Sequence, residues 1–402
     1  MEFSLIFEGQ LGDTSRKSER QVFLDGVDQA VLADQLGFDR FYAVEHHGLE
    51  GYAHSSAPEV FLSYVAAKTK RIRVAHGVAC LPFKMNHPVR VAERVSTLDI
   101  LSGGRLDVGV GRSSSKREQE TFGITAEETH AQLEHSLRAM VKMWTEDEMS
   151  YESEILNIPK RTIRPRPIQD PHPSLSLACT RGESLELAGK WGLGAISNGV
   201  DGPNQAKLKR KIYDDARAAR KPGDMVGKFE TDRFGTAVFT TILDDAEEAR
   251  RIGMRGLRFF LESARYFFAG QGERPRPETW LDHAENMRVL DELTRPKIDP
   301  VATANAVGAI GMAPATSGVG LANASWSGVD FYDKATTAFG SANDTIQFVE
   351  GMQAAGVDEA MFVVQVGGVP QEAVMETIQQ LGDKVIPHFR KASPTVISLS
   401  NA

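Results

Sequence analysis

The 402-residue sequence has only two cysteines, Cys80 and Cys179, and they lie 99 positions apart. No Cys-x-x-Cys pair is present, so the chain lacks both a disulfide framework and the cysteine spacing of a zinc site. The histidines His54, His76 and His87 are scattered and offer no third ligand to the adjacent pair His46 and His47. We therefore expect no metal site and two buried, reduced thiols, as is usual in the cytoplasm.

Positive charge is also scarce. Lysine and arginine number 46 against 54 acidic residues, which leaves a formal net charge of −8. A nucleic-acid-binding protein needs a basic surface to neutralise phosphates, so this balance excludes nucleic acid as an expected partner. A small anionic ligand is not excluded, because a local cluster of arginines is enough to bind one.

The sequence lacks a long hydrophobic run. Acidic residues flank the short apolar stretch between Met1 and Glu8, so the N-terminus does not have the basic start of a signal peptide. Residues 301–329 carry no charge, but they consist largely of Ala, Gly, Ser, Thr and Asn and are too polar for a spanning helix. We expect no membrane contact, and we interpret 301–329 as part of an irregular insertion that serves as a lid.

Apolar runs alternate with segments of helical periodicity along the chain, and this pattern predicts a parallel α/β protein. The predicted strands are 3–7, 41–44, 72–81, 106–110, 175–179, 195–197, 234–241 and 360–365. Eight such units in one chain predict a single (β/α)8 TIM barrel with insertions over residues 1–402, interrupted by an irregular insertion at about 267–340. A doubly wound sheet is the alternative, but no Gly-x-Gly-x-x-Gly follows the first strand.

The active site of such a barrel lies where its strands end, so polar residues at those points are candidates. Glu45-His46-His47 follows the second strand, and two adjacent side chains there point to opposite sides, so only one imidazole can face the mouth. A histidine that is merely hydrogen-bonded in the rim is the alternative. Pocket candidates at the ends of other strands are Glu8, Cys80 and Asn198.

Two further strand ends favour an anion. The segment 111–117 combines glycine, serines and three positive charges, with Arg112 and Ser113 at its start. The segment Thr180-Arg181-Gly182-Glu183-Ser184 lies where the fifth strand turns into a helix, whose free amides attract a phosphate. A solvated basic loop and ordinary helix capping are the alternatives. Because the two segments end neighbouring strands, we favour a phosphate-bearing cofactor.

The order of these and other short motifs resembles that of the bacterial luciferase-like flavin monooxygenases. The resemblance covers roughly residues 1–200 and 340–390. The motifs that carry it are Gly37-Phe38-Asp39, Glu45-His46-His47, Leu81-Pro82, His87-Pro88-Val89-Arg90, Leu98-Asp99, Ser102-Gly103-Gly104-Arg105, Gly109-x-Gly111-Arg112, Gly356-Val357-Asp358-Glu359 and Val385-Ile386-Pro387-His388-Phe389-Arg390.

The resemblance implies a two-component enzyme. A separate NAD(P)H:flavin reductase supplies reduced FMN, dioxygen adds to give a C4a-(hydro)peroxyflavin, and one oxygen atom enters a small organic substrate. The uncharged, small-residue stretch 301–329 leads us to expect an apolar substrate. The resemblance also implies a homodimer or a heterodimer. By position in the family's motifs, His46 is the catalytic histidine, with Glu45 beside it. The remaining implied residues are Gly77 and Val78 at a cis peptide near the flavin ring, and Arg112, Ser113, Thr180, Arg181, Gly182 and Ser184 around the FMN phosphate. The pocket candidates Glu8, His47, Cys80 and Asn198 rest on their positions at strand ends.

Some features depart from the family. Gly111 stands where luciferase has a reactive cysteine, so neither light emission nor oxidation of long-chain aldehydes is expected. Residues 200–340 have no counterpart, which leaves the substrate open. Two alternatives remain: a deazaflavin-dependent oxidoreductase that transfers a hydride, and a non-catalytic flavin-binding subunit of a luciferase-like heterodimer. The Glu45-His46-His47 triplet favours the monooxygenase over both.

Overall fold

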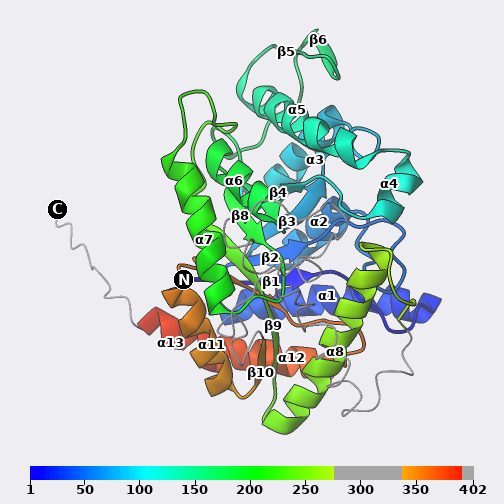
Figure 1. The fold of residues 1–402 in the computed structure, drawn as a ribbon, viewed down its shortest axis with the longest axis vertical. Coiled ribbons are helices and arrows are strands. Elements are labelled where there is room, and N and C mark those ends of the chain that lie inside the picture. Colours follow the sequence, from blue (N-terminus) through cyan, green and yellow to red (C-terminus); the bar gives the residue numbers. More distant parts are fainter. Residues whose placement is uncertain (276–336, 392–402) are drawn as a thin grey trace, which may run out of the picture.

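The computed structural model describes residues 1–275 and 337–391, and its central feature is a closed barrel of eight parallel strands (Figure 1). The strands are paired in the order β9-β11-β1-β2-β3-β4-β7-β8, and β8 pairs with β9 to close the ring. This confirms the predicted (β/α)8 barrel. The strands are β1 (Glu2–Phe7), β2 (Arg40–Ala43), β3 (Arg73–Cys80), β4 (Leu106–Gly111), β7 (Leu175–Cys179), β8 (Gly194–Ser197), β9 (Phe234–Ile242) and β11 (Glu359–Val363).

Helices follow the strands and cover the outside of the barrel. Their ends follow local sequence rules: Pro88 occupies the first turn of α3, Thr125 and Glu128 form the capping box of α5, and Gly37 ends α1 in a left-handed conformation. None of the described helices has the length and apolar character needed to cross a bilayer. The helices are α1 (Arg16–Leu36), α2 (Pro58–Lys68), α3 (Pro88–Leu101), α4 (Lys116–Phe122), α5 (Ala126–Thr145), α6 (Gly182–Trp191), α7 (Pro203–Ala218), α8 (Ala246–Phe267), α11 (Ala342–Ala354), α12 (Gln371–Gln380), the π-helix η2 (Leu381–Val385) and α13 (Ile386–Lys391).

The structure differs from the prediction in two segments. Helix α4 begins inside the segment 111–117 that was interpreted as a loop, because the Ser115 side chain caps it and Gly123 ends it. Strand β10 (Ala338–Gly340) pairs with the end of β9, so the predicted irregular insertion is wrong for its last residues. Residues 276–336, including the stretch 301–329, lie outside the described part of the chain. Strands β5 (Met149–Glu152) and β6 (Asn157–Arg161) form a separate antiparallel pair.

A network of buried charged side chains fills the barrel at the amino-terminal ends of its strands. Glu359 Oε1 accepts a hydrogen bond from Arg40 Nη1 at 3.1 Å, and Oε2 accepts one from the Tyr42 hydroxyl at 3.1 Å. Arg233 Nε also lies 3.0 Å from Oε2. Arg40 Nε also pairs with Asp107. Burial raises the pKa of Asp107, but hydrogen bonds from Arg73 and the charges of Arg40 and Arg233 outweigh it and hold the pKa well below the usual range. These residues stand at the starts of their strands, so the network closes the amino-terminal end of the barrel. Open space is left at the carboxyl end.

Candidate active site

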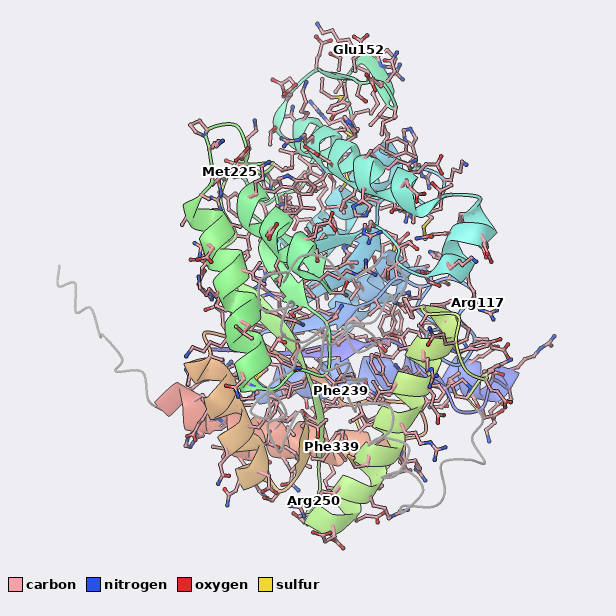
Figure 2. The ribbon with its side chains drawn as sticks, viewed as in Figure 1. Arg117, Glu152, Met225, Phe239, Arg250 and Phe339 are labelled. Atoms are coloured by element: carbon pink, nitrogen blue, oxygen red, sulfur yellow. The ribbon has the colours of Figure 1, made fainter. Side chains whose placement is uncertain are left out.

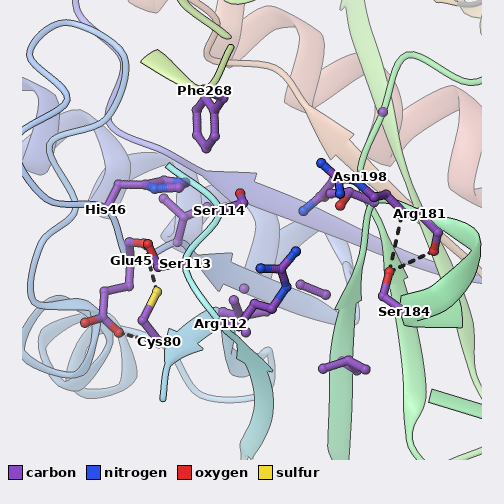
Figure 3. Close-up of a pocket in the computed structure, with 18 of the residues that line it drawn as sticks. Glu45, His46, Cys80, Arg112, Ser113, Ser114, Arg181, Ser184, Asn198 and Phe268 are labelled. Carbon is purple, nitrogen blue, oxygen red and sulfur yellow. Dashed lines mark hydrogen bonds between the residues drawn. The ribbon is translucent and has the colours of Figure 1, made fainter. Parts of the chain in front are cut away.

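A cavity of about 390 Å³ lies at the carboxyl ends of the barrel strands (Figure 3). This volume falls within the range of pockets that bind small ligands. Most residues proposed from the sequence line it together, although they come from six different strands and the loops that follow them. The predicted residues that line the cavity are Glu8, Glu45, His46, Gly77, Val78, Cys80, Arg112, Ser113, Thr180, Arg181, Ser184 and Asn198.

Two predicted site residues do not line the cavity. The imidazole of His47 turns away from it: Nε2 lies 3.0 Å from Glu45 Oε1, and the ring packs edge-on against Phe122 at 5.1 Å. The prediction that His47 lines the pocket is therefore wrong. Side chains of neighbouring residues in an extended chain point to opposite sides, so only one of the two imidazoles can face the cavity. Gly182 begins α6 and is also absent from the lining, so direct contact through this residue is not supported.

His46 is paired with a buried carboxylate. Its Nδ1 lies 3.0 Å from Oε1 of Glu118, whose side chain is completely buried, while the His46 side chain keeps 21% of its surface exposed. Burial alone lowers the pKa of His46, but the charge of Glu118 and their hydrogen bond outweigh it, so the pKa is raised. The pKa of Glu118 shifts in the opposite direction: burial raises it, but the charge of His46 and the hydrogen bond between the two residues hold it below the ordinary value. Both shifts favour an imidazolium–carboxylate pair.

Glu118 is the functional candidate that sequence reasoning missed. Besides His46, it accepts a hydrogen bond from the His47 backbone N–H at 2.9 Å and one from the Ser113 hydroxyl at 3.1 Å. These contacts fix its orientation, and through it that of the His46 ring. The residue was overlooked because 111–117 was interpreted as a flexible loop. The spacing Ser115-x-x-Glu118, the same as at the start of α5, was the signal that predicted a helix here.

Glu45 binds several groups around the site in addition to His47. Its carboxylate accepts hydrogen bonds from the Cys80 backbone N–H at 2.8 Å and from the Asn86 amide at 2.6 Å. The Cys80 thiol lies in the same buried region, and its pKa is raised well above the ordinary value by burial and then by the charge of Glu45. Although acidic residues, histidines and a thiol meet here, no group of three or more within 1–275 and 337–391 has the arrangement needed to hold a metal ion.

One pole of the cavity is cationic. Arg112 follows β4, and Arg181 lies at the N-terminus of α6, whose dipole adds to the positive potential. The pKa of Arg112 is lowered by burial and then by repulsion from Arg181. His130, which sequence reasoning did not single out, has its pKa lowered by burial and by the same two arginines. Two guanidinium groups that repel each other, beside a histidine whose charged form they disfavour, form a site that a phosphate would stabilise. We call this group the cationic pole.

The remaining predicted phosphate contacts surround Arg181. Thr180 and Ser184 line the cavity beside it, and Figure 3 shows Arg181, Ser184 and Asn198 together on the side away from His46. The Ser184 hydroxyl donates to the Arg181 carbonyl at 2.8 Å, which closes the first turn of α6. Hydroxyls, guanidinium groups and a helix N-terminus are a donor set that fits the phosphate of FMN.

The opposite pole is aromatic. The His46 ring lies 5.7 Å from the rings of Tyr52 and Phe268, and Tyr52 in turn lies 5.7 Å from Phe260. Phe239 continues the cluster at 4.7 Å from Phe260. Figure 3 shows the Phe268 ring above His46, and Figure 2 shows Phe239 inside the barrel. All five residues line the cavity, and we call Tyr52, Phe239, Phe260 and Phe268 the aromatic wall.

Glycines let β3 and β4 approach closely beside the cavity. The Gly77–Val78 peptide is cis, as the resemblance implied. A Cβ on Gly109 would come within 2.3 Å of a backbone carbonyl of β3, and one on Gly111 within 2.5 Å of Val78. Position 111 therefore has no room for a cysteine unless Val78 moves, so the departure from luciferase is built into the packing of these two strands.

Comparison with known proteins agrees with this geometry. The family model described as luciferase-like monooxygenase matches residues 1–359. Over 179 residues the chain is 30% identical to the oxygenase component of the flavin-dependent trigonelline monooxygenase of Acinetobacter baylyi, a match that covers 44% of this chain and 48% of that protein. The chain spans about half the length of this and other curated relatives that it matches.

Solved structures share the fold. The oxygenating constituent of the 3,6-diketocamphane monooxygenase of Pseudomonas putida, in complex with FMN, superposes with a TM-score of 0.66 at 18% identity, covering 96% of this chain and 98% of that one. An F420-dependent secondary alcohol dehydrogenase, bound to an F420–acetone adduct, gives 0.65 at 15% identity and covers 96% and 98%. At these identities the likeness establishes the fold alone.

Proposed function

Because the chain belongs to the luciferase-like monooxygenase family, we propose that it uses reduced FMN and dioxygen to insert one oxygen atom into a small, apolar organic substrate. The observation that carries the proposal is the polarity of the cavity. A cationic pole stands at one end, and a buried His46–Glu118 pair with an aromatic wall stands at the other. A flavin phosphate fits the first, and reacting atoms that need a proton fit the second.

The cationic pole orients the cofactor. Arg112 offers a planar guanidinium, Arg181 a second, and the first turn of α6 adds backbone amides and a dipole. These groups would hold the phosphate and thereby point the flavin ring toward Val78 and His46. Bound reduced FMN supplies the two electrons that activate dioxygen.

His46 is the proton donor at the aromatic end of the cavity in this proposal. Since Nδ1 is engaged by Glu118, Nε2 is the nitrogen that faces the cavity, and it has no hydrogen-bond partner among the described residues. The raised pKa keeps this Nε2 protonated over a wider pH range than in a free histidine, which suits a group that donates a hydrogen bond or a proton to a developing oxyanion. We assign Glu118 as the residue that positions the ring.

The aromatic wall excludes water. Tyr52, Phe260 and Phe268 cover His46 with apolar surface, so little solvent competes for the proton on Nε2. The same surface gives an apolar substrate its binding energy.

Two partners belong to the proposal. A separate NAD(P)H:flavin reductase supplies the reduced FMN, in keeping with the name "oxygenase component" of the trigonelline relative.

A second copy or a sister chain forms a dimer with this chain. Three large apolar side chains, Val60 and Tyr64 on α2 and Leu101 on α3, are 67%, 51% and 64% exposed, which is unusual for residues of this kind. Light scattering during gel filtration tests the dimer. The free thiols fit a cytoplasmic enzyme.

The flavin proposal is tested by rapid mixing. Free reduced FMN and protein-bound reduced FMN are mixed with aerated buffer, and flavin oxidation is followed by absorbance. We expect the wild-type protein to slow oxidation and to resolve it into more than one phase, and His46→Ala to remove the slow phase while FMN still binds. Oxidation at the rate of free flavin, despite bound FMN, would contradict the proposal.

A deazaflavin-dependent hydride transfer is the second candidate, because an F420-dependent dehydrogenase shares the fold. The His46–Glu118 pair is compatible with either chemistry, since hydride transfer to a carbonyl also leaves an oxyanion that needs a proton. Binding titrations with FMN and with coenzyme F420 separate the two, and tight binding of F420 alone would establish the alternative. A non-catalytic subunit would bind FMN and leave its oxidation rate unchanged.

A further inference from the structure

A carboxylate stands within the apolar end of the cavity and is not used by the mechanism above. Glu8 follows β1, lines the cavity and lies close enough to His46 and Tyr52 for its charge to act on the pKa of both. Its Oε2 accepts a hydrogen bond from the Gln10 amide, and Oε1 has no partner among the described residues. Glu8 keeps partial exposure, and the cavity it lines accounts for that exposure.

A carboxylate among aromatic rings is costly unless something bonds to it. Burial raises the pKa of Glu8, and the positive charge of His46 and the bond from Gln10 only partly offset this effect. A donor from a bound molecule would satisfy Oε1 and reduce the cost. The Tyr52 hydroxyl, which also has no partner among the described residues, lines the same part of the cavity.

We propose that the substrate is a flat aromatic compound carrying a neutral hydroxyl or amine, which stacks on the aromatic wall and donates a hydrogen bond to Glu8. The substrate class rests on the proposed function, whereas the contact itself does not require oxygen chemistry. The wall consists of rings from three separate elements, which suits a planar ring more than a branched alkyl group.

Charge at this end of the cavity selects a neutral molecule. An anionic substrate would face the carboxylates of Glu8, Glu45 and Glu118. A quaternary cation has no hydrogen to donate to Oε1 of Glu8, and it would lie beside the His46 imidazole, whose charged form Glu118 favours. A neutral O–H or N–H donor meets neither penalty and still bonds to Oε1 of Glu8.

The inference is tested by calorimetry with matched probes. 2-Naphthol has the donor, 2-methoxynaphthalene has the same rings without it, and N-methylquinolinium carries a positive charge. Each is titrated into the full-length protein without flavin and with saturating FMN. The variants are Glu8→Leu, which removes the acceptor, and Glu8→Gln, which keeps an acceptor but removes the charge. Glu134→Gln is the matched control, because Glu134 is a carboxylate of the same cavity carried by α5.

We expect the wild-type protein and Glu134→Gln to bind 2-naphthol about ten-fold more tightly than 2-methoxynaphthalene, as a hydrogen bond to a charged acceptor predicts. The preference should fall below about two-fold in Glu8→Leu and be intermediate in Glu8→Gln. Circular dichroism verifies that each variant is folded.

Three outcomes would overturn the inference. These are no preference in the wild-type protein, a preference that survives in Glu8→Leu, and tighter binding of N-methylquinolinium than of 2-naphthol. Failure of every probe to bind would overturn it too. FMN binding is measured in parallel: if FMN binds and the preference is absent, only this inference fails. If the preference is present and FMN does not bind, only the proposed function fails.

Discussion

The replacement Glu118→Gln isolates the charge of the residue that holds His46. Glutamine has the same shape, and its carbonyl oxygen can accept the bonds that Glu118 Oε1 now accepts from His46 Nδ1 and the His47 N–H, at 3.0 and 2.9 Å. Its amide nitrogen would then face the Ser113 hydroxyl at 3.1 Å, which can accept as well as donate. The geometry is preserved, and the negative charge is lost.

We expect Glu118→Gln to lower the pKa of His46, because the charge that offsets the burial of this ring is removed. The free energy of unfolding should fall by about 1–2 kcal/mol, the difference between a charge-assisted and a neutral hydrogen bond. Glu118→Ala also leaves buried donors without an acceptor and should cost about 3–5 kcal/mol. The His46 titration is followed by NMR of the imidazole carbons, and stability by urea unfolding.

The pair also sets a pH window for stability. The lowered pKa of Glu118 means that its contribution is present above the ordinary value of 4.5 and is lost as the pH falls through the folded-state value. The raised pKa of His46 means that its contribution is present below 6.5 and is lost as the pH rises through the folded-state value. Glu118→Gln should flatten both flanks.

Glu120→Gln is the control for this experiment. Glu120 lies on the same helix, two residues further along, but its side chain is 65% exposed. It should leave both the His46 titration and the pH profile of stability unchanged. A His46 pKa that is the same in Glu118→Gln as in the wild-type protein would refute the assignment of Glu118 as the residue that tunes His46.

Three further predictions concern other parts of the site. Arg112→Ala and Arg181→Ala should each weaken FMN about ten-fold or more in equilibrium titrations, and riboflavin, which lacks the phosphate, less than about two-fold; equal losses for both flavins would rule out the cationic pole as a phosphate site. Gly109→Ala should destabilise the protein by about 1–3 kcal/mol in thermal unfolding, because its Cβ would meet a backbone carbonyl at 2.3 Å. Burial raises the pKa of Cys80 well above its usual range and that of Cys179 to about 12, so a disulfide reagent at pH 8 should label neither thiol until urea is added.

Much of the fold is predictable from the sequence because its signals are local. Each barrel strand is a short apolar run, and each run predicted from the sequence coincides with an observed strand to within two residues at either end. The parallel order follows from the helices between them. The cavity residues His46, Arg112 and Arg181 are predictable for a related reason, since strand ends of a barrel converge on one face.

The aromatic wall was not predictable in the same way. Phe260 lies in α8, where its spacing is that of any amphipathic helix, and Phe268 directly follows the helix. Only the packing of α8 across the barrel brings Phe268 to His46 and Phe260 to Tyr52. Tyr52 lies in a loop without a recognisable pattern. Contacts between segments more than two hundred residues apart are set by tertiary packing, which short-range patterns do not encode.

The packing of α4 against α8 has a mechanical consequence. Arg117 lies over the Tyr266 ring at 4.4 Å, at the end of α8 where Figure 2 labels it, and the Ser115 hydroxyl bonds to the carbonyl of Phe267. Glu118 directly follows Arg117 on α4. A molecule that displaces the last turn of α8 therefore also pulls on the helix that holds the His46 ring. The contact with α8 and the residue that positions the proton donor thus lie on one short helix, through which binding at the aromatic end could act on His46.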